Sequence, residues 1–227
     1  MPRIKMRRPR TYWLGQKVMN FPDFAHQSQR GRALRITEVG ELVLHERAAD
    51  VTEFGTPELL TLVDDMFASM DVAEGVGLAA VQVGVPLQVF VYDLVDDDDD
   101  RHVGAVINPV LTIDDAAKPE VTGEGCLSVP GAHMELARPG GATICGFDVF
   151  GKPIELTATG YLARCFIHET QHLLGMLYLD HLTPEQQAEA LAQRDERRPD
   201  VLIRRAEAAI EQGKEPIAYP ETPAGGR

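Results

Sequence analysis

An apolar segment runs from Gly160 to Gly175 and is interrupted by a His-Glu-x-x-His pattern. Because glycine commonly follows the last residue of a helix, we expect one helix of about fourteen residues between these glycines. Apolar residues fall on more than one face of this helix, which is typical of a helix buried nearly all round. His168 and His172 are four positions apart and therefore share a face, with Glu169 at its edge.

Two further helices follow from the spacing of apolar and capping residues. Apolar positions at helical spacing predict a helix over residues 57–72. A Thr-Pro-Glu-Gln sequence at Thr183 has the N-cap, the proline and the capping glutamine of a helix start. The composition that follows predicts a C-terminal helix reaching Gln212, with a break at Pro199.

Short runs rich in β-branched and aromatic residues predict strands. The last two runs are joined by Gly151 and Lys152, which indicates a hairpin. Hairpins favour antiparallel pairing, so we predict an α+β fold with mainly antiparallel sheets wrapped around the buried helix that carries His-Glu-x-x-His, and with a C-terminal helix. The predicted strands are residues 87–92, 105–113, 142–150 and 153–158, with an edge segment at 39–45.

Length and composition predict one globular domain with two extensions. The chain has 227 residues, of which 44% are hydrophobic, enough for a single sizeable core. We predict a basic, loosely ordered extension at residues 1–35, a single domain with a C-terminal helix at 36–212 and a disordered tail at 213–227. An organellar transit peptide is the alternative for the first segment, but its prolines would break an amphipathic helix.

Charge and cysteine content indicate which broad classes of protein the chain does not resemble. The net charge of -13 owes much to an acidic run at residues 96–100, which suits a solvated loop, and no basic face for nucleic acid is visible. Neither a membrane-spanning segment nor a secretory signal is found, so we expect a cytoplasmic protein. The three cysteines are widely spaced and are interpreted as reduced thiols rather than as a disulfide framework.

Two glycine-flanked segments are candidates for loops beside the buried helix. Residues 75–84 lack the third glycine of a dinucleotide fingerprint and the Gly-Lys-Ser/Thr of a phosphate-binding loop, so a nucleotide site is rejected. Small residues there allow close approach of a ligand, and Gln82 is the one polar side chain among apolar neighbours. Residues 124–131 form a second irregular segment, which contains Cys126.

The two histidines and the glutamate of the buried helix point to a metal site, because zinc hydrolases use this arrangement. The alternative is a pair of core histidines bonded to backbone carbonyls. That alternative leaves Glu169 in need of a buried partner that the sequence does not supply.

Three motifs in this order resemble those of the peptide deformylase family: Gly-x-Gly-Leu-Ala-Ala-x-Gln at 75–82, Glu-Gly-Cys-Leu-Ser at 124–128 and His-Glu-x-x-His at 168–172. The resemblance extends over about residues 39–182. It implies an enzyme that removes the formyl group from the N-terminal methionine of newly made bacterial polypeptides and releases formate. N-formyl-methionyl nascent peptides are the partners that the resemblance implies.

The resemblance also assigns roles to individual residues. Cys126 becomes the third metal ligand beside His168 and His172. Glu169 becomes the general base, and the side-chain amide of Gln82 and the backbone N–H of Leu127 become donors to the oxyanion. The family implies iron(II), whereas a thiolate with two imidazoles would by ligand softness suggest zinc, and zinc, nickel or cobalt can occupy the purified protein.

Substrate contacts are implied as well. Backbone groups of the residues at 76–77 bind the peptide, and a pocket ahead of His168 takes the methionine side chain. Glu124 is also expected to pair with Arg138. The implied substrate-binding residues are Val76, Gly77, Glu124, Gly125, Tyr161, Arg164 and Cys165.

Several departures from the family pattern are visible, among them Ile167 before the first histidine, where glutamine is frequent. Gln171 stands where the family usually carries aspartate before the second histidine. The arginines of the C-terminal helix are interleaved with acids, which argues against the ribosome contact that some members make through a basic C-terminal helix.

Two other functions are weighed against the deformylase. A zinc endopeptidase of the long His-Glu-x-x-His type needs histidine at position 178, where Tyr178 stands. A zinc endopeptidase with a glutamate ligand leaves Cys126 without a role. A degraded deformylase that only binds nascent N-termini is the alternative from another class. The presence of all three ligands together with Glu169 and Gln82 argues against it.

Overall fold

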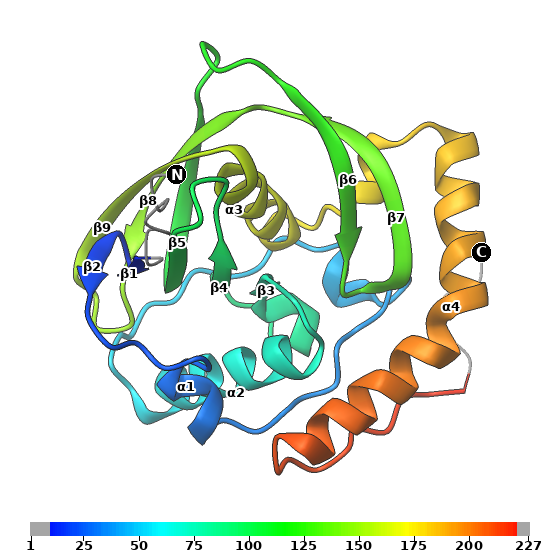
Figure 1. The fold of residues 1–227 in the computed structure, drawn as a ribbon, viewed down its shortest axis with the longest axis horizontal. Helices are drawn as coiled ribbons and strands as arrows, with labels where there is room; N and C mark the ends of the chain where they lie inside the picture. Colours follow the sequence, from blue (N-terminus) through cyan, green and yellow to red (C-terminus); the bar gives the residue numbers. More distant parts are fainter. Residues whose placement is uncertain (1–9, 222–227) are drawn as a thin grey trace, which may run out of the picture.

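A computed structural model describes residues 10–221 as a curled sheet, a separate hairpin and four helices (Figure 1). The helices are α1 (His26–Arg30), α2 (Pro57–Val72), α3 (Gly160–Leu173) and α4 (Pro184–Glu211), with 3-10 turns η1 (Leu42–Leu44), η2 (Ala80–Val83) and η3 (Tyr178–His181). The sheet contains β1 (Thr11–Trp13), β2 (Gln16–Val18), β3 (Gly77–Ala79), β4 (Val89–Val95), β5 (Arg101–Ile113), β8 (Gly141–Phe147) and β9 (Pro153–Thr159). The hairpin contains β6 (Glu120–Cys126) and β7 (Val129–Arg138).

The long strand β5 organises the sheet. Its first half pairs with β4, its second half pairs with β8, and β8 continues into β9, so the order is β2-β1-β5-β4-β3 with β8 and β9 branching from β5. The register shifts between Ile107 and Val110, where Asn108 has a φ of 50° and bonds the backbone of Val51. Every pairing except β1 with β5 is antiparallel, which confirms the predicted α+β fold.

Helix α3 is buried because one face of the sheet packs against it. Side chains of β4 alternate, so that Phe90 and Tyr92 belong to the cluster around α3, whereas Val89 and Val91 pack in the cluster around α2. The ring of Phe166 in α3 meets Tyr92 edge to face, with 5.1 Å between centroids. Helix α3 is thus held between the sheet and the β6–β7 hairpin, as Figure 1 shows.

The β6–β7 hairpin was not predicted. Residues 124–131 were expected to be irregular, but they include the end of β6 and the start of β7. Glycines and exposed polar residues in β6 conceal the alternation, while β7 buries every second residue over much of its length. These buried residues pack against η3 and α4. Arg164 of α3 donates to the Leu136 and Glu120 carbonyls and links the hairpin to α3.

Two other sequence predictions are corrected by the structure. Residues 39–45 contain the 3-10 turn η1 and no strand, because hydrogen bonds from Leu44 to Glu41 and from His45 to Leu42 close the backbone locally. The helix at Pro184–Glu211 continues through Pro199, and Figure 1 shows it bending in its middle. A proline inside a helix can kink rather than end it when tertiary packing supports both halves.

The expected loose extension at 1–35 is corrected for the part that the structure describes. Strand β1 pairs with β5, Arg10 bonds the side chain of Asp100, and α1 packs on α2. These residues lack a periodic pattern of their own and gain order from long-range pairing. Residues 1–9 lie outside the described part of the chain.

The expected disordered tail at 213–227 also makes defined contacts over its first part. The Nζ of Lys214 donates to the carbonyls of Ser28 and Gly31, and the hydroxyl of Tyr219 accepts from the backbone N–H of Ile36. Residues 222–227 lie outside the described part. No helix within residues 10–221 is long and apolar enough to cross a membrane.

Candidate metal centre and substrate cleft

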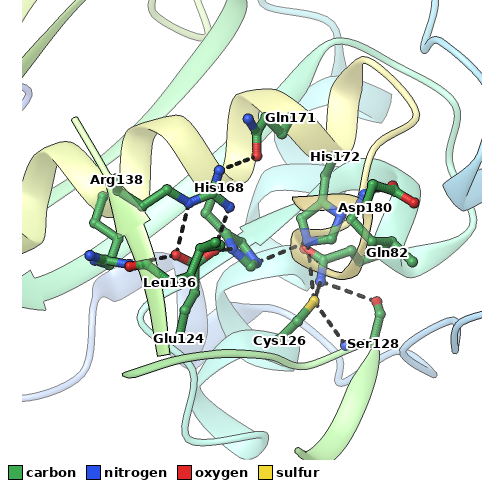
Figure 2. Close-up of polar contacts among 12 residues, drawn as sticks. Gln82, Glu124, Cys126, Ser128, Leu136, Arg138, His168, Gln171, His172 and Asp180 are labelled. Carbon is green, nitrogen blue, oxygen red and sulfur yellow. Dashed lines mark hydrogen bonds and ion pairs between the residues drawn. The ribbon is translucent and has the colours of Figure 1, made fainter. Parts of the chain in front are cut away.

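Three side chains from two elements converge at the buried face of α3. The Nε2 atoms of His168 and His172 are 3.1 Å apart, and the Cys126 Sγ at the end of β6 is 3.2 Å from the His172 Nε2 (Figure 2). The three ligand atoms all lie within 4.8 Å of one another. The spacing of four residues put both histidines on one face, but only the hairpin brings the cysteine to them.

The hydrogen bonding and the chemistry of these three side chains fit a metal ion. The Nδ1 of His168 is 2.8 Å from the Glu124 Oε1, so the carboxylate accepts the Nδ1 proton and leaves Nε2 free to ligate. A thiol sulfur and two imidazole nitrogens that face each other suit a metal better than they suit mutual hydrogen bonds. A three-residue ligand set leaves a position open for water or substrate.

Glu124 is the centre of a buried ionic network. It accepts from Arg138 at 3.0 and 2.6 Å and from the Arg164 Nη1 at 2.8 Å, in addition to His168. Burial alone would raise the pKa of Glu124, but hydrogen bonds from His168 and Arg138 outweigh it and hold the pKa far below its usual range. The expected pair with Arg138 is present. Because these partners occupy both carboxylate oxygens, the geometry favours positioning of His168 over the predicted direct substrate contact.

Arg164 and Gln171 complete this network from α3, as Figure 2 shows for Gln171. Arg164 is buried and also donates to the carbonyls of Leu136 and Glu120, so its guanidinium is tied to the hairpin. The Oε1 of Gln171 accepts from the Nη1 of Arg138 at 2.8 Å. A neutral side chain therefore still bonds Arg138 at the position where the family pattern has an acid.

Glu169 lies beside Cys126, His168 and His172, and one of its carboxylate oxygens makes no hydrogen bond within residues 10–221. The side chain is buried, and this oxygen is Oε2. Burial raises the pKa of Glu169 to about 7, although the nearby His168 opposes the shift. A carboxylate with a pKa near neutrality can both accept and return a proton.

Gly77 allows β3 to approach this carboxylate, and Gly77→Ala is expected to lower turnover by at least about tenfold. A Cβ at position 77 would lie 2.5 Å from the Glu169 Oε1 and 2.9 Å from the Cys165 Sγ, so Glu169 must move. Gly123→Ala is the matched control, because a Cβ there meets nothing within 4 Å. Steady-state kinetics of both variants test this, and equal turnover in the two would contradict it.

Gln82 is oriented by its own backbone neighbourhood. Its Oε1 accepts from the N–H of Ala79 at 2.8 Å, which directs the Nε2 toward the Cys126 Sγ at 3.6 Å and the Ser128 Oγ at 3.2 Å (Figure 2). The side-chain amide therefore presents a donor beside the ligand group. The sequence around Gln82 gave no sign of this direction.

A cleft of about 330 Å³ opens over the ligand group and contains all of the predicted substrate-binding positions in its lining. Burial raises the pKa of the Cys165 thiol well above its usual value, so this part of the wall is uncharged. The sequence missed other lining residues, because their elements reach the cleft only in the folded chain. Among them are His133, whose ring lies against Gly125, and Val201, Arg204 and Arg205 of α4.

A group that could hold a metal ion, a buried carboxylate beside it and an amide donor in the same cleft are the parts that a metal-dependent hydrolase needs. A family model described as polypeptide deformylase matches residues 33–188. Peptide deformylase 1 of Streptomyces avermitilis is 52% identical over 174 residues, which are 75% of this chain and 80% of that protein.

Solved structures agree with the sequence relatives. A peptide deformylase from Legionella pneumophila superposes with a TM-score of 0.67 at 37% identity, covering 74% of this chain and 96% of that chain. A peptide deformylase from Synechococcus elongatus in complex with actinonin gives a TM-score of 0.66 at 33% identity, covering 73% and 88%. The chain therefore belongs to the polypeptide deformylase family. Its reaction is removal of the N-formyl group from newly made polypeptides.

Proposed function

We propose that this chain hydrolyses the formyl amide of N-formyl-methionyl peptides with Glu169 as the proton carrier and with Gln82 and Leu127 as oxyanion donors. The convergence of Cys126, His168 and His172 beside the buried Glu169 carries this proposal. The overall reaction adds water across the formyl C–N bond and yields formate and a free methionyl amine.

The metal that we propose is iron(II), held by Cys126, His168 and His172, with zinc, nickel or cobalt able to take its place. When bound, such an ion polarises the carbonyl and lowers the pKa of water toward neutrality. The donor set supports a divalent transition metal, and iron rests on the family resemblance.

Glu169 then performs both proton transfers. It takes a proton from the attacking water and later returns it to the leaving amine, so one group serves both steps. Its pKa of about 7 suits a group that must be ionised before attack and protonated afterwards.

Developing negative charge on the formyl oxygen requires hydrogen-bond donors. The Nε2 of Gln82 supports this role, because its amide is already oriented by Ala79. The backbone N–H of Leu127, next to the ligand Cys126, is the second proposed donor. Fixed donors stabilise the transition state without reorganising during the reaction.

The substrate is proposed to lie along the lining of the cleft. Backbone groups of Val76 and Gly77 bind the peptide, and Tyr161, Cys165 and the aliphatic stem of Arg164 surround the methionine side chain. The capture of the Arg164 guanidinium by Glu124 supports this, because only the apolar stem is left for the pocket.

A direct assay tests the proposed function. The wild-type chain, purified without oxygen, is expected to release formate from formyl-Met-Ala, to leave acetyl-Met-Ala intact and to be inhibited by actinonin. Activity of an iron-loaded sample is expected to decay in air, and nickel or cobalt loading to preserve it. Cleavage of internal peptide bonds, or tight binding of formyl-Met-Ala without release of formate, would refute the proposal.

Cys126→Ala is expected to lower bound metal by at least about tenfold, because loss of even an outer partner of a ligand typically costs 10–100-fold. Cys145→Ala is the matched control, since Cys145 is an exposed thiol on β8. Elemental analysis after anaerobic purification measures both variants. Equal metal content would remove Cys126 from the ligand set.

We propose that the enzyme works in the cytoplasm on nascent chains without docking on the ribosome through α4. Arg194, Arg198 and Arg205 of this helix are buried against the domain. Such internal use of the arginines supports a packing role for α4 rather than a basic docking face.

A further inference from the structure

The second half of α4 forms part of the wall of the substrate cleft. After the bend near Pro199, Val201, Arg204 and Arg205 line the cleft, and Figure 1 shows this half running back toward α2. The family model ends at residue 188, so these residues lie outside the matched region. A segment outside the region that the family model matches therefore reaches the site.

This half of α4 contacts the tip of the β6–β7 hairpin. Leu127 and Ser128 form its two-residue turn. The Ser128 carbonyl accepts from the N–H of Val39 at 2.9 Å, and its Oγ accepts from Gln82 at 3.2 Å. The Leu127 carbonyl accepts from the Nη2 of Arg205 at 2.9 Å. Of the three residues that hold the tip, only Arg205 lies beyond the matched region.

The surroundings of Arg205 do not suggest a stabilising ion pair. Its side chain is buried, and within residues 10–221 it has no carboxylate partner and an Nε without a hydrogen bond. Its other contact is Tyr219, whose hydroxyl accepts from Nη1 at 3.2 Å and whose ring centre is 5.7 Å from the guanidinium carbon. Burying a cation among neutral partners costs free energy, so a role outside stability explains Arg205 better.

We propose that Arg205 is a positioning residue that fixes the hairpin tip so that the Leu127 N–H points at the substrate oxyanion; this rests on the proposed function. The N–H of Leu127 has no hydrogen-bond partner in the described part of the chain, as a donor reserved for substrate requires. The N–H and the carbonyl of Leu127 flank the same Cα atom. A hydrogen bond that holds the carbonyl therefore restricts the direction of the N–H. A hydrogen bond from a charged guanidinium is stronger than a neutral one. Tyr219 in turn orients the guanidinium from the tail.

Arg205→Met tests the proposal, because methionine keeps the apolar stem and removes both the charge and the hydrogen bond. We expect a folded, fully metal-loaded variant with the thermal midpoint of the wild type, a kcat for formyl-Met-Ala lowered by about 10–100-fold and a KM within about threefold, since a donor misplaced by 1 Å can cost 10²-fold. Arg205→Lys can still donate to the Leu127 carbonyl and should recover most of the kcat. Amide hydrogen exchange over residues 126–128, measured without substrate, should be faster in Arg205→Met.

Arg197→Met is the matched control. Arg197 is an exposed arginine of the same helix that donates to a backbone carbonyl of the same hairpin, at Gly131 instead of the tip. The kcat of Arg197→Met and its amide hydrogen exchange over residues 126–128 should match those of the wild type. The proposal is overturned if Arg205→Met keeps the wild-type kcat or if Arg197→Met loses as much kcat as Arg205→Met does. It is also overturned if Arg205→Lys recovers none of the lost kcat. Failure of Arg205→Met to fold would overturn it too, because Arg205 would then be a core residue. An inactive wild type would refute the proposed function, whereas unchanged exchange in Arg205→Met would refute only the role of Arg205.

Discussion

Replacing Glu169 by glutamine is expected to lower turnover by about 10²–10⁴-fold with unchanged metal content. Glutamine keeps the size of the side chain but cannot accept the proton of the attacking water. The Oε2 of Glu169 is buried without a partner in the described residues, so the substitution breaks no existing bond at that atom. Steady-state kinetics with formyl-Met-Ala, elemental analysis and substrate affinity measure the three quantities.

Glu155→Gln provides the control for this substitution. Glu155 is an exposed acid of β9, and its change should leave turnover unaltered. A Glu169→Gln protein that still removes the formyl group at a near wild-type rate would refute the proton-transfer mechanism while leaving the fold and the metal ligands in place.

The second large effect is expected from Glu124→Gln, which should lower the free energy of unfolding by about 3–5 kcal/mol. Glu124 is the buried anion between Arg138 and Arg164, and removing its charge leaves two buried cations without a counterion. The same change weakens the acceptor that fixes the His168 tautomer, so bound metal should fall as well. Chemical denaturation of the metal-loaded protein and elemental analysis measure the two effects.

A double-mutant cycle can test whether the two uncompensated arginines cause the loss of unfolding free energy in Glu124→Gln. Arg164→Met removes one of the two cations, so in the Glu124→Gln background it should cost much less than in the wild type. Glu135→Gln, at an exposed position of β7, is the control. Additive effects of the Glu124 and Arg164 substitutions would show that the network is not the source of the loss.

Elements that are specified by local sequence patterns could be predicted before the fold was known. The predicted helix at 57–72 coincides with α2, because its apolar spacing and its Thr56 cap are contained in one short segment. Helix α3 and the start of α4 at Thr183 were predicted for the same reason. A spacing of four residues also placed His168 and His172 on one face before any fold was known.

Features that depend on contacts between distant segments could not be predicted from local patterns. Strands β1 and β6 are ordered by their partner strands, and their sequences carry little periodicity of their own. The direction of the Gln82 amide depends on the Ala79 N–H, and the path of the Arg164 guanidinium depends on Glu124. Both are set by packing that no spacing rule encodes.

The cleft also combines residues that the sequence could predict with residues that only the folded chain brings together. Motif residues on α3 and the adjoining loops could be assigned from the sequence, whereas the contribution of α4 could not. A proline inside a helix allows either an end or a bend, and only the packing of the second half, with Arg205 on the Leu127 carbonyl, selects the bend. The sequence thus predicted which residues carry the chemistry. How these residues face one another follows from the folded chain, because hydrogen bonds between distant segments fix their directions.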